Sequence, residues 1–352
     1  MFSDNHIKPH RNRFSCLLSY PHTLPHHVLW KNFSRIRALT TILFLTACCP
    51  GALPEAVSLH THKYASSPIT ISSAEGGALD IFTFHDDRLR RLDSYQRIEG
   101  FTGNTAYAES TSGERIFFFC LSQQRQTFEW ADMNSYFSLE KVRIDLENET
   151  RDFLTKTGEC RAAAGEIGRG ATLKTLVAAI RIDRISCDFS GTPYAGRPMT
   201  DVRAYLTNVN ATYRLTGPDY NNPERLINQG MLNGSDLKAF READMVFADL
   251  TERLGEATLR PEVNFLCFPN GSDGTGIGAP FTRLVIEGKI DGITYYWPIS
   301  IKGIERACLY SYDILIRRKG TSNPDIPIEL GECEIQFDIK SWKEKEEYGV
   351  RF

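Results

Sequence analysis

Side chains that could carry acid–base or metal chemistry are scarce in this chain. The sequence holds eight histidines in 352 residues, and none of them follows His85. His60 and His62 have the spacing of two metal ligands, but no acid or cysteine adjoins them to complete a set, so we interpret the pair as coincidental. The lack of histidine excludes His-dependent nucleophilic catalysis and most zinc sites from nearly the whole body. We therefore expect no enzyme activity, no metal and no cofactor.

Three other motifs allow both a chemical and a structural interpretation. Asp86 and Asp87 could contribute to a calcium site, but Ca²⁺ takes about six to eight oxygen ligands, and a turn between strands accounts for both acids. Residues 271–278 (GSDGTGIG) are rich in glycine, yet a strand rather than a helix follows them, which predicts a hairpin loop instead of a phosphate site. Tyr295 and Trp297 share one face of a predicted strand and could stack on a sugar. We expect them to pack in the core.

Residues 38–48 (ALTTILFLTAC) have the features of a secretory signal. Three basic residues between positions 31 and 37 precede a short apolar stretch, which ends in small residues. Ten residues span only about 15 Å as a helix, too short for a bilayer core of about 30 Å. The ending Leu-Thr-Ala-Cys is similar to the lipobox of bacterial lipoproteins, in which the cysteine is lipidated and becomes the first mature residue. Cys48 is therefore the predicted lipidation site; a buried helix that ends in cysteine is the alternative.

Residues 1–30 are rich in His and Pro and do not resemble the start of a signal. We expect either that translation begins downstream of Met1 or that this segment is a disordered leader, and we assign 1–47 to leader and signal. Residues 1–47 carry six basic residues and one acid, so a whole-chain charge of −3 leaves −8 on the rest. An acidic body without a basic stripe argues against nucleic acid as a partner.

Six cysteines follow Cys48 and Cys49, and none of them forms a C-x-x-C pair. Most lie in apolar stretches, as in residues 116–120 (IFFFC). Export permits disulfides, but a free cysteine is also a small buried hydrophobic residue. We favour mostly buried thiols, and the sequence does not fix a pairing.

The first half of the body is predicted to contain strands, one helix and irregular segments. Residues 51–77 indicate a tether with one extended piece, Ile69–Ile71, and residues 78–84 (ALDIFTF) and 115–121 predict strands, the second buried on both faces. Apolar residues at three- and four-residue spacing predict a helix over 135–149. Small residues over 155–170 indicate a domain boundary.

The second half is predicted to be mainly strand. Strands are expected within 172–189, 202–206, 282–290, 293–301, 310–318 and 332–340, a loop over 208–233, and a helix from about Ser235 to Leu250. Asp291-Gly292 predicts a type I′ hairpin, because both central residues of that turn need a positive φ. Alternation over 332–340 predicts one buried face, with Ile335, Phe337 and Ile339, and one wet face. Many strands and few helices favour β-sandwiches.

These segments, in this order, resemble a known family. The lipobox is followed by ALDIFTF with its acidic turn, GERIFFFCLS (113–122), a small-residue linker and LVAAIRIDRI (176–185). The end is the most similar part: YYWPI (295–299), YDILI (312–316), Gly320, Asn323-Pro-Asp325, Pro327 and an alternating strand into Trp342. Together they resemble the Bacteroidales-type fimbrillins, the type V pilin superfamily, over residues 66–352. The stretch 208–261 shows no such likeness.

The resemblance implies two transthyretin-like antiparallel β-sandwich (Greek-key) domains in tandem, with one short helix inserted in each. The domains would follow a tether at 48–65 and occupy 66–154 and 155–352. It also implies export as a lipoprotein and assembly by strand exchange with other fimbrillin-like subunits, in which a partner's extended segment adds to a sheet. The positions implied for strand exchange or for the last strand are Ile69, Ile71, Ile335, Phe337, Ile339, Trp342, Val350 and Phe352.

One departure from the family pattern bears on the role of the subunit. Stalk subunits of the family are trimmed by an arginine-specific protease before their first core strand, but residues 48–78 contain no arginine and one basic residue, Lys63. We therefore predict an untrimmed anchor or accessory subunit. Cys49 rather than Asp follows the lipidation site, which favours the outer membrane and cell surface. The alternative is a monomeric surface lipoprotein that binds glycan or host protein without polymerising.

Overall fold

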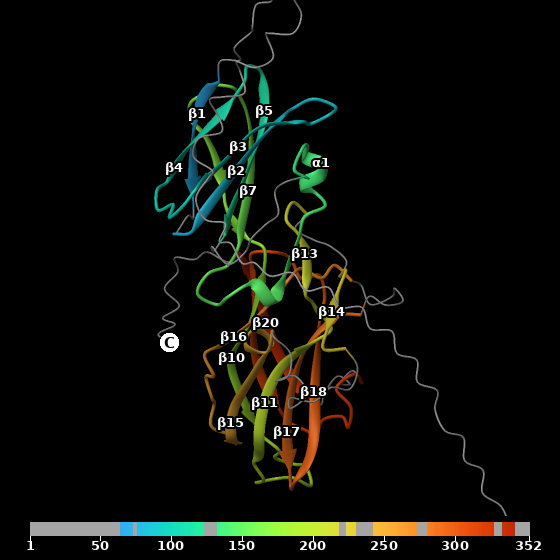
Figure 1. Ribbon diagram of the computed structural model, residues 1–352. Helices are drawn as coiled ribbons and strands as arrows, with labels where there is room; N and C mark the ends of the chain where they lie inside the picture. Colours follow the sequence, from blue (N-terminus) through green and yellow to red (C-terminus); the bar gives the residue numbers. More distant parts are fainter. Residues whose placement is uncertain are drawn as a thin grey trace, which may run out of the picture. The chain divides into compact units, whose positions relative to one another are not determined.

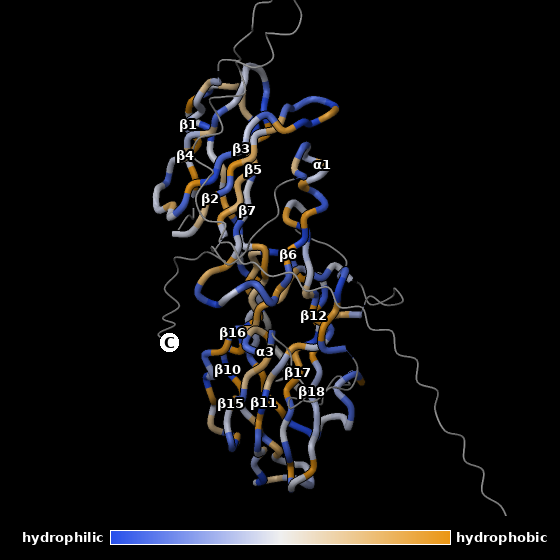
Figure 2. The backbone as a smooth tube through the Cα atoms, in the orientation of Figure 1, coloured by the Kyte–Doolittle hydropathy of each residue, from blue (hydrophilic) through white to orange (hydrophobic). Residues whose placement is uncertain are grey.

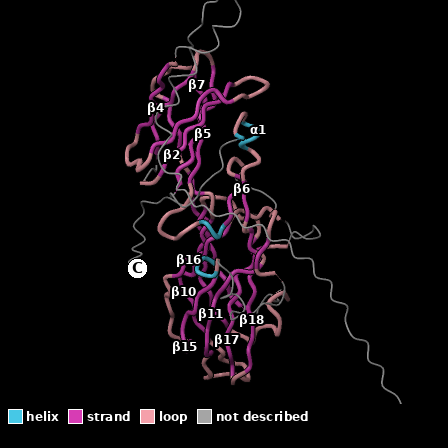
Figure 3. Tube along the Cα trace, in the orientation of Figure 1, coloured by secondary structure: helices cyan, strands magenta, loops and turns pink. Residues whose placement is uncertain are grey.

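The computed structural model describes residues 64–72, 76–122, 132–217, 223–229, 242–272, 280–326 and 333–341. Strands dominate these residues, and helix is limited to short turns (Figure 3). No helix in this part of the chain is long and apolar enough to span a bilayer. The prediction of a mainly β protein built of sandwiches is confirmed.

The described strands form six sheets (Figure 1). A five-stranded sheet has the order β3 (Leu92–Ile98), β2 (Ala78–His85), β5 (Glu114–Ser122), β7 (Lys156–Ala163), β9 (Lys174–Thr175). A three-stranded sheet has the order β4 (Thr105–Ser110), β1 (Ala65–Ser72), β8 (Arg169–Thr172). Two four-stranded sheets follow: β16 (Val263–Cys267), β10 (Ala178–Cys187), β19 (Cys308–Ile316), β20 (Cys333–Ser341); and β15 (Phe247–Leu254), β11 (Met199–Thr207), β17 (Thr282–Ile290), β18 (Ile293–Ile301). Two pairs complete the set: β12 (Val209–Asn210) with β14 (Leu226–Ile227), and β13 (Thr212–Arg214) with β6 (Arg143–Asp145).

The three- and five-stranded sheets enclose a core of their own. Ile69 and Ile71 of β1 and the alanines of β4 pack against Leu79 and Ile81 of β2 and Phe117 of β5. We call this pair of sheets the first sandwich. The opposite face of β2 and β5 is also buried, as β5 was predicted to be, because Phe82, Phe84 and Phe118 belong to the larger core of the chain. Figure 2 shows the hydrophobic residues concentrated along such strands.

The last third of the chain confirms the predicted hairpin. Asp291 and Gly292 have φ of 53° and 83°, and Ile290 faces Ile293 across the turn. Trp297 is fully buried and its ring centre lies 6.4 Å from that of Tyr295, so the predicted core packing also holds. The indole N–H of Trp297 donates to the Arg318 carbonyl at 3.1 Å.

The predicted helix over 135–149 is wrong over most of its length, and the helix predicted from Ser235 is wrong from Phe247 to Leu250, while its residues 235–241 lie outside the described residues. The segment 135–149 holds one helical turn, α1 (Tyr136–Leu139), then β6 and a 3-10 turn, η2 (Leu146–Asn148). Backbone hydrogen bonds to β13 and its flanks, such as Leu146 N–H to the Ala211 carbonyl at 2.9 Å, replace the helical ones. The segment predicted as a helix to Leu250 contains α3 (Ala243–Val246) and then β15, whose residues pair with β11.

Two segments predicted to be irregular contain paired strands. The small-residue stretch 155–170 is not a linker, since β7 pairs with β5 along its whole length and β8 begins at Arg169. The first sandwich therefore draws on strands up to Thr175, beyond the predicted boundary at 154/155; the division into domains stays a prediction. The predicted loop 208–233 contains β12, β13 and β14. The single extended piece expected at 69–71 is an eight-residue strand.

Two strand pairs are parallel, which the antiparallel prediction did not include. β1 runs parallel to β8, and β10 runs parallel to β19. The cysteines follow the prediction of mostly buried thiols: Cys120, Cys187 and Cys267 are buried, and Cys160 and Cys308 are partly buried.

Candidate functional site

Strand β1 is held in the first sandwich by neighbours on both sides. Its register places Ser67 opposite Ala108 of β4 and Ile71 opposite Ala171 of β8. Ile69 and Ile71 are 0% and 1% exposed, so both predicted positions lie in the core. Ser67 is also fully buried, and its Oγ accepts a hydrogen bond from the Gly165 N–H at 2.9 Å. We call the space between β4 and β8 the β1 slot.

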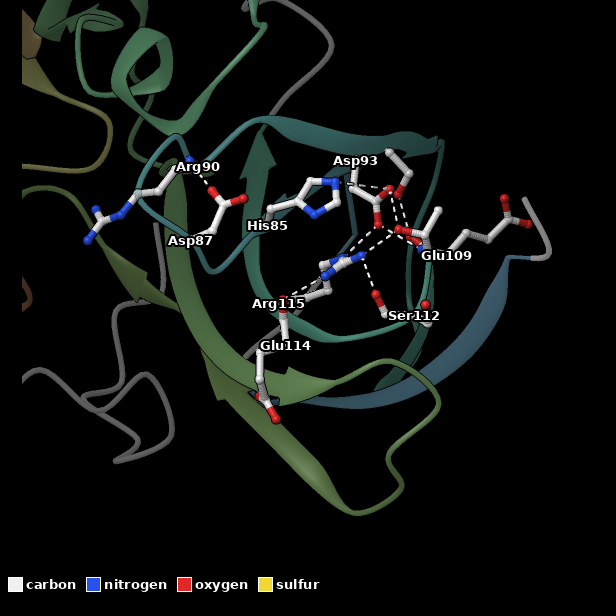
Figure 4. Close-up of polar contacts among 10 residues, drawn as sticks. His85, Asp87, Arg90, Asp93, Glu109, Ser112, Glu114 and Arg115 are labelled. Atoms are coloured by element: carbon white, nitrogen blue, oxygen red, sulfur yellow. Dashed lines mark hydrogen bonds and ion pairs between the residues drawn. The ribbon is translucent and has the colours of Figure 1, made fainter. Parts of the chain in front are cut away.

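A buried ion pair braces the β4 side of this slot. Arg115 Nε of β5 lies 2.8 Å from Asp93 Oδ2 of β3, and both side chains are 4% exposed (Figure 4). Asp93 also accepts from the backbone and hydroxyl of Thr111, at 2.7 and 2.9 Å, and Thr111 directly follows β4. Ser94 adds a hydrogen bond to the Glu109 carbonyl. These contacts tie the end of β4 to β3 and β5 through residues that do not belong to β1.

The same contacts set the protonation of Asp93. Burial by itself would raise its pKa, but hydrogen bonds from Arg115 and Thr111 outweigh burial and hold the pKa below its usual value. His85 Nε2 lies 3.7 Å from Asp93 Oδ1. Figure 4 shows His85, Asp93 and Arg115 gathered at one end of the sheet. The cluster is internally neutralised, and its geometry suits bracing rather than catalysis.

A second buried carboxylate lies on β2. Asp80 is fully buried and accepts from Tyr95 Oη at 2.7 Å and from Arg97 Nη1 at 3.0 and 3.1 Å. Burial raises its pKa in spite of these bonds. It also raises the pKa of Tyr95, with Asp80 adding to the effect. The three residues join β2 to β3 and leave Asp80 without access to solvent.

The turn between β7 and β8 braces the other side of the slot. Glu166 accepts from the Ala163 N–H at 3.0 Å and from Arg169 Nε at 2.8 Å. These bonds hold the pKa of Glu166 below its usual value. Gly165, at φ +81°, lets the turn approach β1.

A cavity of about 670 Å³ lies elsewhere, between residues 146–152 and 242–245. Its buried carboxylates have protein partners: Glu149 accepts from the Thr155 N–H at 2.7 Å, and Glu242 pairs with Arg225 at 3.0 Å. Arg151 donates to the carbonyls of Asp244 and Asn264. These contacts link loops to one another, and no group of His, Cys, Asp and Glu in the described residues has a metal-binding arrangement.

The remaining predicted site positions fall into two groups. Ile335 and Phe337 lie on β20, opposite Ile314 and Tyr312, and β20 is the outer strand of its sheet. Ile339 is on the same strand but is 50% exposed, so the prediction that it faces the core is wrong; its neighbours Asp338 and Lys340 are exposed too. Cys48, Trp342, Val350 and Phe352 lie outside the described residues.

The sequence reasoning missed the two braces. The one available signal was Arg115, a charged residue at the start of an apolar stretch, which needs a partner if it is buried. Nothing local identifies Asp93 as that partner.

Comparison with solved structures identifies the architecture. The chain is similar to a candidate cell adhesion protein from Bacteroides eggerthii, with a TM-score of 0.58 and 15% identity over 80% of this chain and 96% of that one. A candidate cell adhesion protein from Parabacteroides distasonis gives 0.58 and 15% over 79% and 96%, and a fimbrilin from Porphyromonas gingivalis gives 0.56 and 13% over 79% and 97%.

This chain has a fimbrillin-like fold. No protein-family model matches it, and no curated protein matches it in sequence. At this level of identity the likeness concerns the fold, and the fimbrillin-like architecture predicted from residue order is confirmed.

Proposed function

We propose that this fimbrillin-like chain is a non-catalytic subunit of a cell-surface fimbrium, of the anchor or accessory type, contributing to adhesion. The observation that carries the proposal is the β1 slot. The first strand of the folded body fills a groove between two separately braced strands and buries Ile69 and Ile71 in it. Such a slot could accept an extended segment of another subunit only if β1 were removed, and the backbone of that segment would then pair with β4 and β8. Its side chains would fill the two isoleucine sites.

Whether a protease can remove β1 from the slot determines the position of the subunit in the fibre. β1 joins β2 through residues 73–77 (SAEGG), which contain neither arginine nor lysine. The arginines nearest to this link, Arg88, Arg90 and Arg91, follow β2, so a cut there would remove a core strand together with β1. We infer that β1 stays in place and that the chain joins a fibre as a strand donor, through β20 or residues 342–352. A subunit that donates but does not accept stands at one end of a fibre.

The lipid on Cys48 supplies the attachment in this proposal. The motif Leu-Thr-Ala-Cys is the basis for proposing this lipid, which would place the chain at the outer membrane and cell surface. Substitution Cys48→Ser should abolish metabolic labelling by palmitate; labelling at the wild-type level would refute lipidation at this residue. The substitution Cys49→Ser is the matched control and should leave labelling unchanged.

The assembly proposal is tested on the fibre itself. Fimbriae purified without heating should give ladders on SDS gels that contain this chain and collapse on boiling. Mass spectrometry of the same material should find a mature N-terminus upstream of Ala65, with β1 retained. A start near Ala65 or beyond would overturn the anchor assignment, and a chain that is always monomeric would favour the surface lipoprotein that binds glycan or host protein.

The slot itself can be tested by opening it on purpose. A recognition sequence for a site-specific protease, inserted between Ser73 and Gly76, would allow β1 to be released after folding. The cleaved chain should bind a synthetic peptide with the β1 sequence ASSPITIS, and a peptide with Asp at both isoleucine positions is the control. Equal binding of the two peptides would exclude a side-chain-specific slot.

A further inference from the structure

Three turns of the first sandwich meet at the end where β1 begins. The turns are residues 86–91, 111–113 and 164–168. The register that brings them together pairs Ala65 with Ser110, His85 with Arg115 and Glu114 with Ala163. A Cβ on Gly165 would lie 3.7 Å from the Ala65 Cβ, so the third turn reaches the start of β1. We call Tyr64 and these three turns the entry end.

Large apolar side chains stand exposed at this end. Tyr64 is 51% exposed, Leu89 54% and Ile167 81%. Single exposed hydrophobic residues are normal on a protein surface. These three come from segments far apart in the sequence, and strand pairing brings all three segments to one end of a sandwich. Leu89 and Ile167 lie within turns, where polar residues are the usual choice.

The charges at the entry end are balanced, unlike those of the rest of the body. Five arginines and five acids belong to its turns and flanks: Arg88, Arg90, Arg91, Arg161 and Arg169, with Asp86, Asp87, Glu109, Glu114 and Glu166. Since residues 48–352 carry −8 in total, the net negative charge lies elsewhere in the body. An anionic surface would therefore repel the entry end less than it repels the rest of the body.

The chain upstream of the entry end leads to the predicted lipid anchor. Sixteen residue steps separate Cys48 from Tyr64, and a fully extended chain covers at most about 3.3–3.6 Å per residue, or roughly 55 Å. An anchor on Cys48 would therefore hold this end of the sandwich within that distance of the bilayer. Tethering raises the effective concentration of a contact, so weak contacts suffice.

We propose that the entry end docks on the lipid bilayer surface, with Tyr64, Leu89 and Ile167 inserted at the boundary between headgroups and acyl chains; this rests on the proposed lipidation of Cys48. Separate apolar tips flanked by long cationic side chains suit such a boundary, because arginine stems cover apolar surface while their heads reach phosphates. Arg88 precedes Leu89 and is the cation that we assign to a phosphate, because the guanidinium of Arg90 lies over the rings of Tyr136 and Phe137, 5.4 and 5.8 Å from their centroids. Docking would set the orientation of the first sandwich on the membrane.

Hydrogen exchange on the complete lipidated chain tests the proposal. Protein purified from outer membranes, with the lipid mass confirmed, would be inserted into preformed vesicles of phosphatidylethanolamine and phosphatidylglycerol. Peptides covering 86–91 and 164–168 would be compared with those of the Cys48→Ser chain in solution. Exchange in both turns should slow about tenfold on vesicles, equivalent to about 1.4 kcal/mol. The double variant Leu89→Ser/Ile167→Ser should lose this protection while staying bound through its lipid.

Two exposed isoleucines outside the entry end provide the matched control for this experiment. Ile293 and Ile326 are 59% and 48% exposed on other segments, so Ile293→Ser/Ile326→Ser should leave the protection intact. Equal exchange in both turns on a chain with confirmed lipid would overturn docking while leaving the anchor in place. Protection that appears only after other subunits are added would assign the surface to protein and overturn the proposal. A chain without lipid would refute the anchor and docking together.

Discussion

Arg115 Nε lies 2.8 Å from Asp93 Oδ2, with each side chain only 4% exposed, and this pair ties β5 and β3 to the end of β4. Removing one partner of a buried ion pair leaves the other charge unpaired, which costs about 3–5 kcal/mol. Arg115→Met should therefore lower the free energy of unfolding in urea by about that amount.

A control pair and a double variant make this prediction specific. Arg184 and Asp313 form an exposed ion pair, so Arg184→Met should shift the urea midpoint far less. Asp93→Asn combined with Arg115→Met should recover part of the loss, because no charge is then left unpaired. If Arg115→Met were as mild as Arg184→Met, the bracing role of the pair would have to be abandoned.

Asp93 and Asp80 should give opposite dependences of stability on pH. The folded-state pKa of Asp93 lies below its usual 3.8, so its stabilising contribution is complete above that value and is lost as pH falls through the lower folded pKa. The folded-state pKa of Asp80 lies above 3.8, so its contribution is complete below 3.8 and declines as pH rises through the raised folded pKa.

Unfolding free energies of the wild type, Asp93→Asn and Asp80→Asn, measured between about pH 3 and 7, check both signs. The difference between wild type and Asp93→Asn should grow with rising pH, and the difference between wild type and Asp80→Asn should move in the opposite direction. Two parallel curves would contradict the assigned pKa directions.

Local patterns in the sequence were enough to predict several elements of this fold. Asp291-Gly292 specifies its own turn, because few other dipeptides adopt two positive φ values. Alternation placed Trp297 in the core. The segment 135–149 shows the limit of such patterns: its helical spacing is real, yet Arg143–Asp145 pairs with β13, almost seventy residues away, and those hydrogen bonds outweigh the local preference.

The candidate site depends on pairings that the sequence does not show. Ile69 and Ile71 could be identified as a short extended piece, but their burial requires β8, a parallel partner one hundred residues further along the chain. Arg115 and Asp93 are 22 residues apart and share no motif. Non-local partners of this kind are chosen by the packed structure as a whole, so one-dimensional periodicity cannot supply them.

Gly320 should tolerate no side chain, because a Cβ there would lie 2.2 Å from the Tyr296 carbonyl oxygen and 2.9 Å from Trp297 Cδ2. Thr321 exchanges backbone hydrogen bonds with Tyr296 at 2.9 and 3.0 Å, which fixes this close approach. Gly320→Ala should cost about 1–3 kcal/mol, the usual range for overpacking.

Gly255 provides the control for this substitution. Its added Cβ would meet nothing within 4 Å and its φ is not positive, so Gly255→Ala should leave the unfolding free energy nearly unchanged. Thermal unfolding of both variants is sufficient to compare them. Equal stability would show that the segment after β19 can move away from β18.

Ile69→Ala tests whether β1 is part of the folded core or only lies against it. Ile69 is fully buried between β4 and β8, and shortening a buried isoleucine to alanine typically costs about 2–5 kcal/mol. Thr70, the next residue, is exposed, so Thr70→Ala should change the unfolding free energy by no more than about 0.5 kcal/mol. The ratio of the two effects, measured in urea on the complete chain, reports how tightly the slot holds its strand. Similar small losses for both variants would mean that β1 contributes little to the core, and the slot would then offer a partner strand no apolar sites to fill.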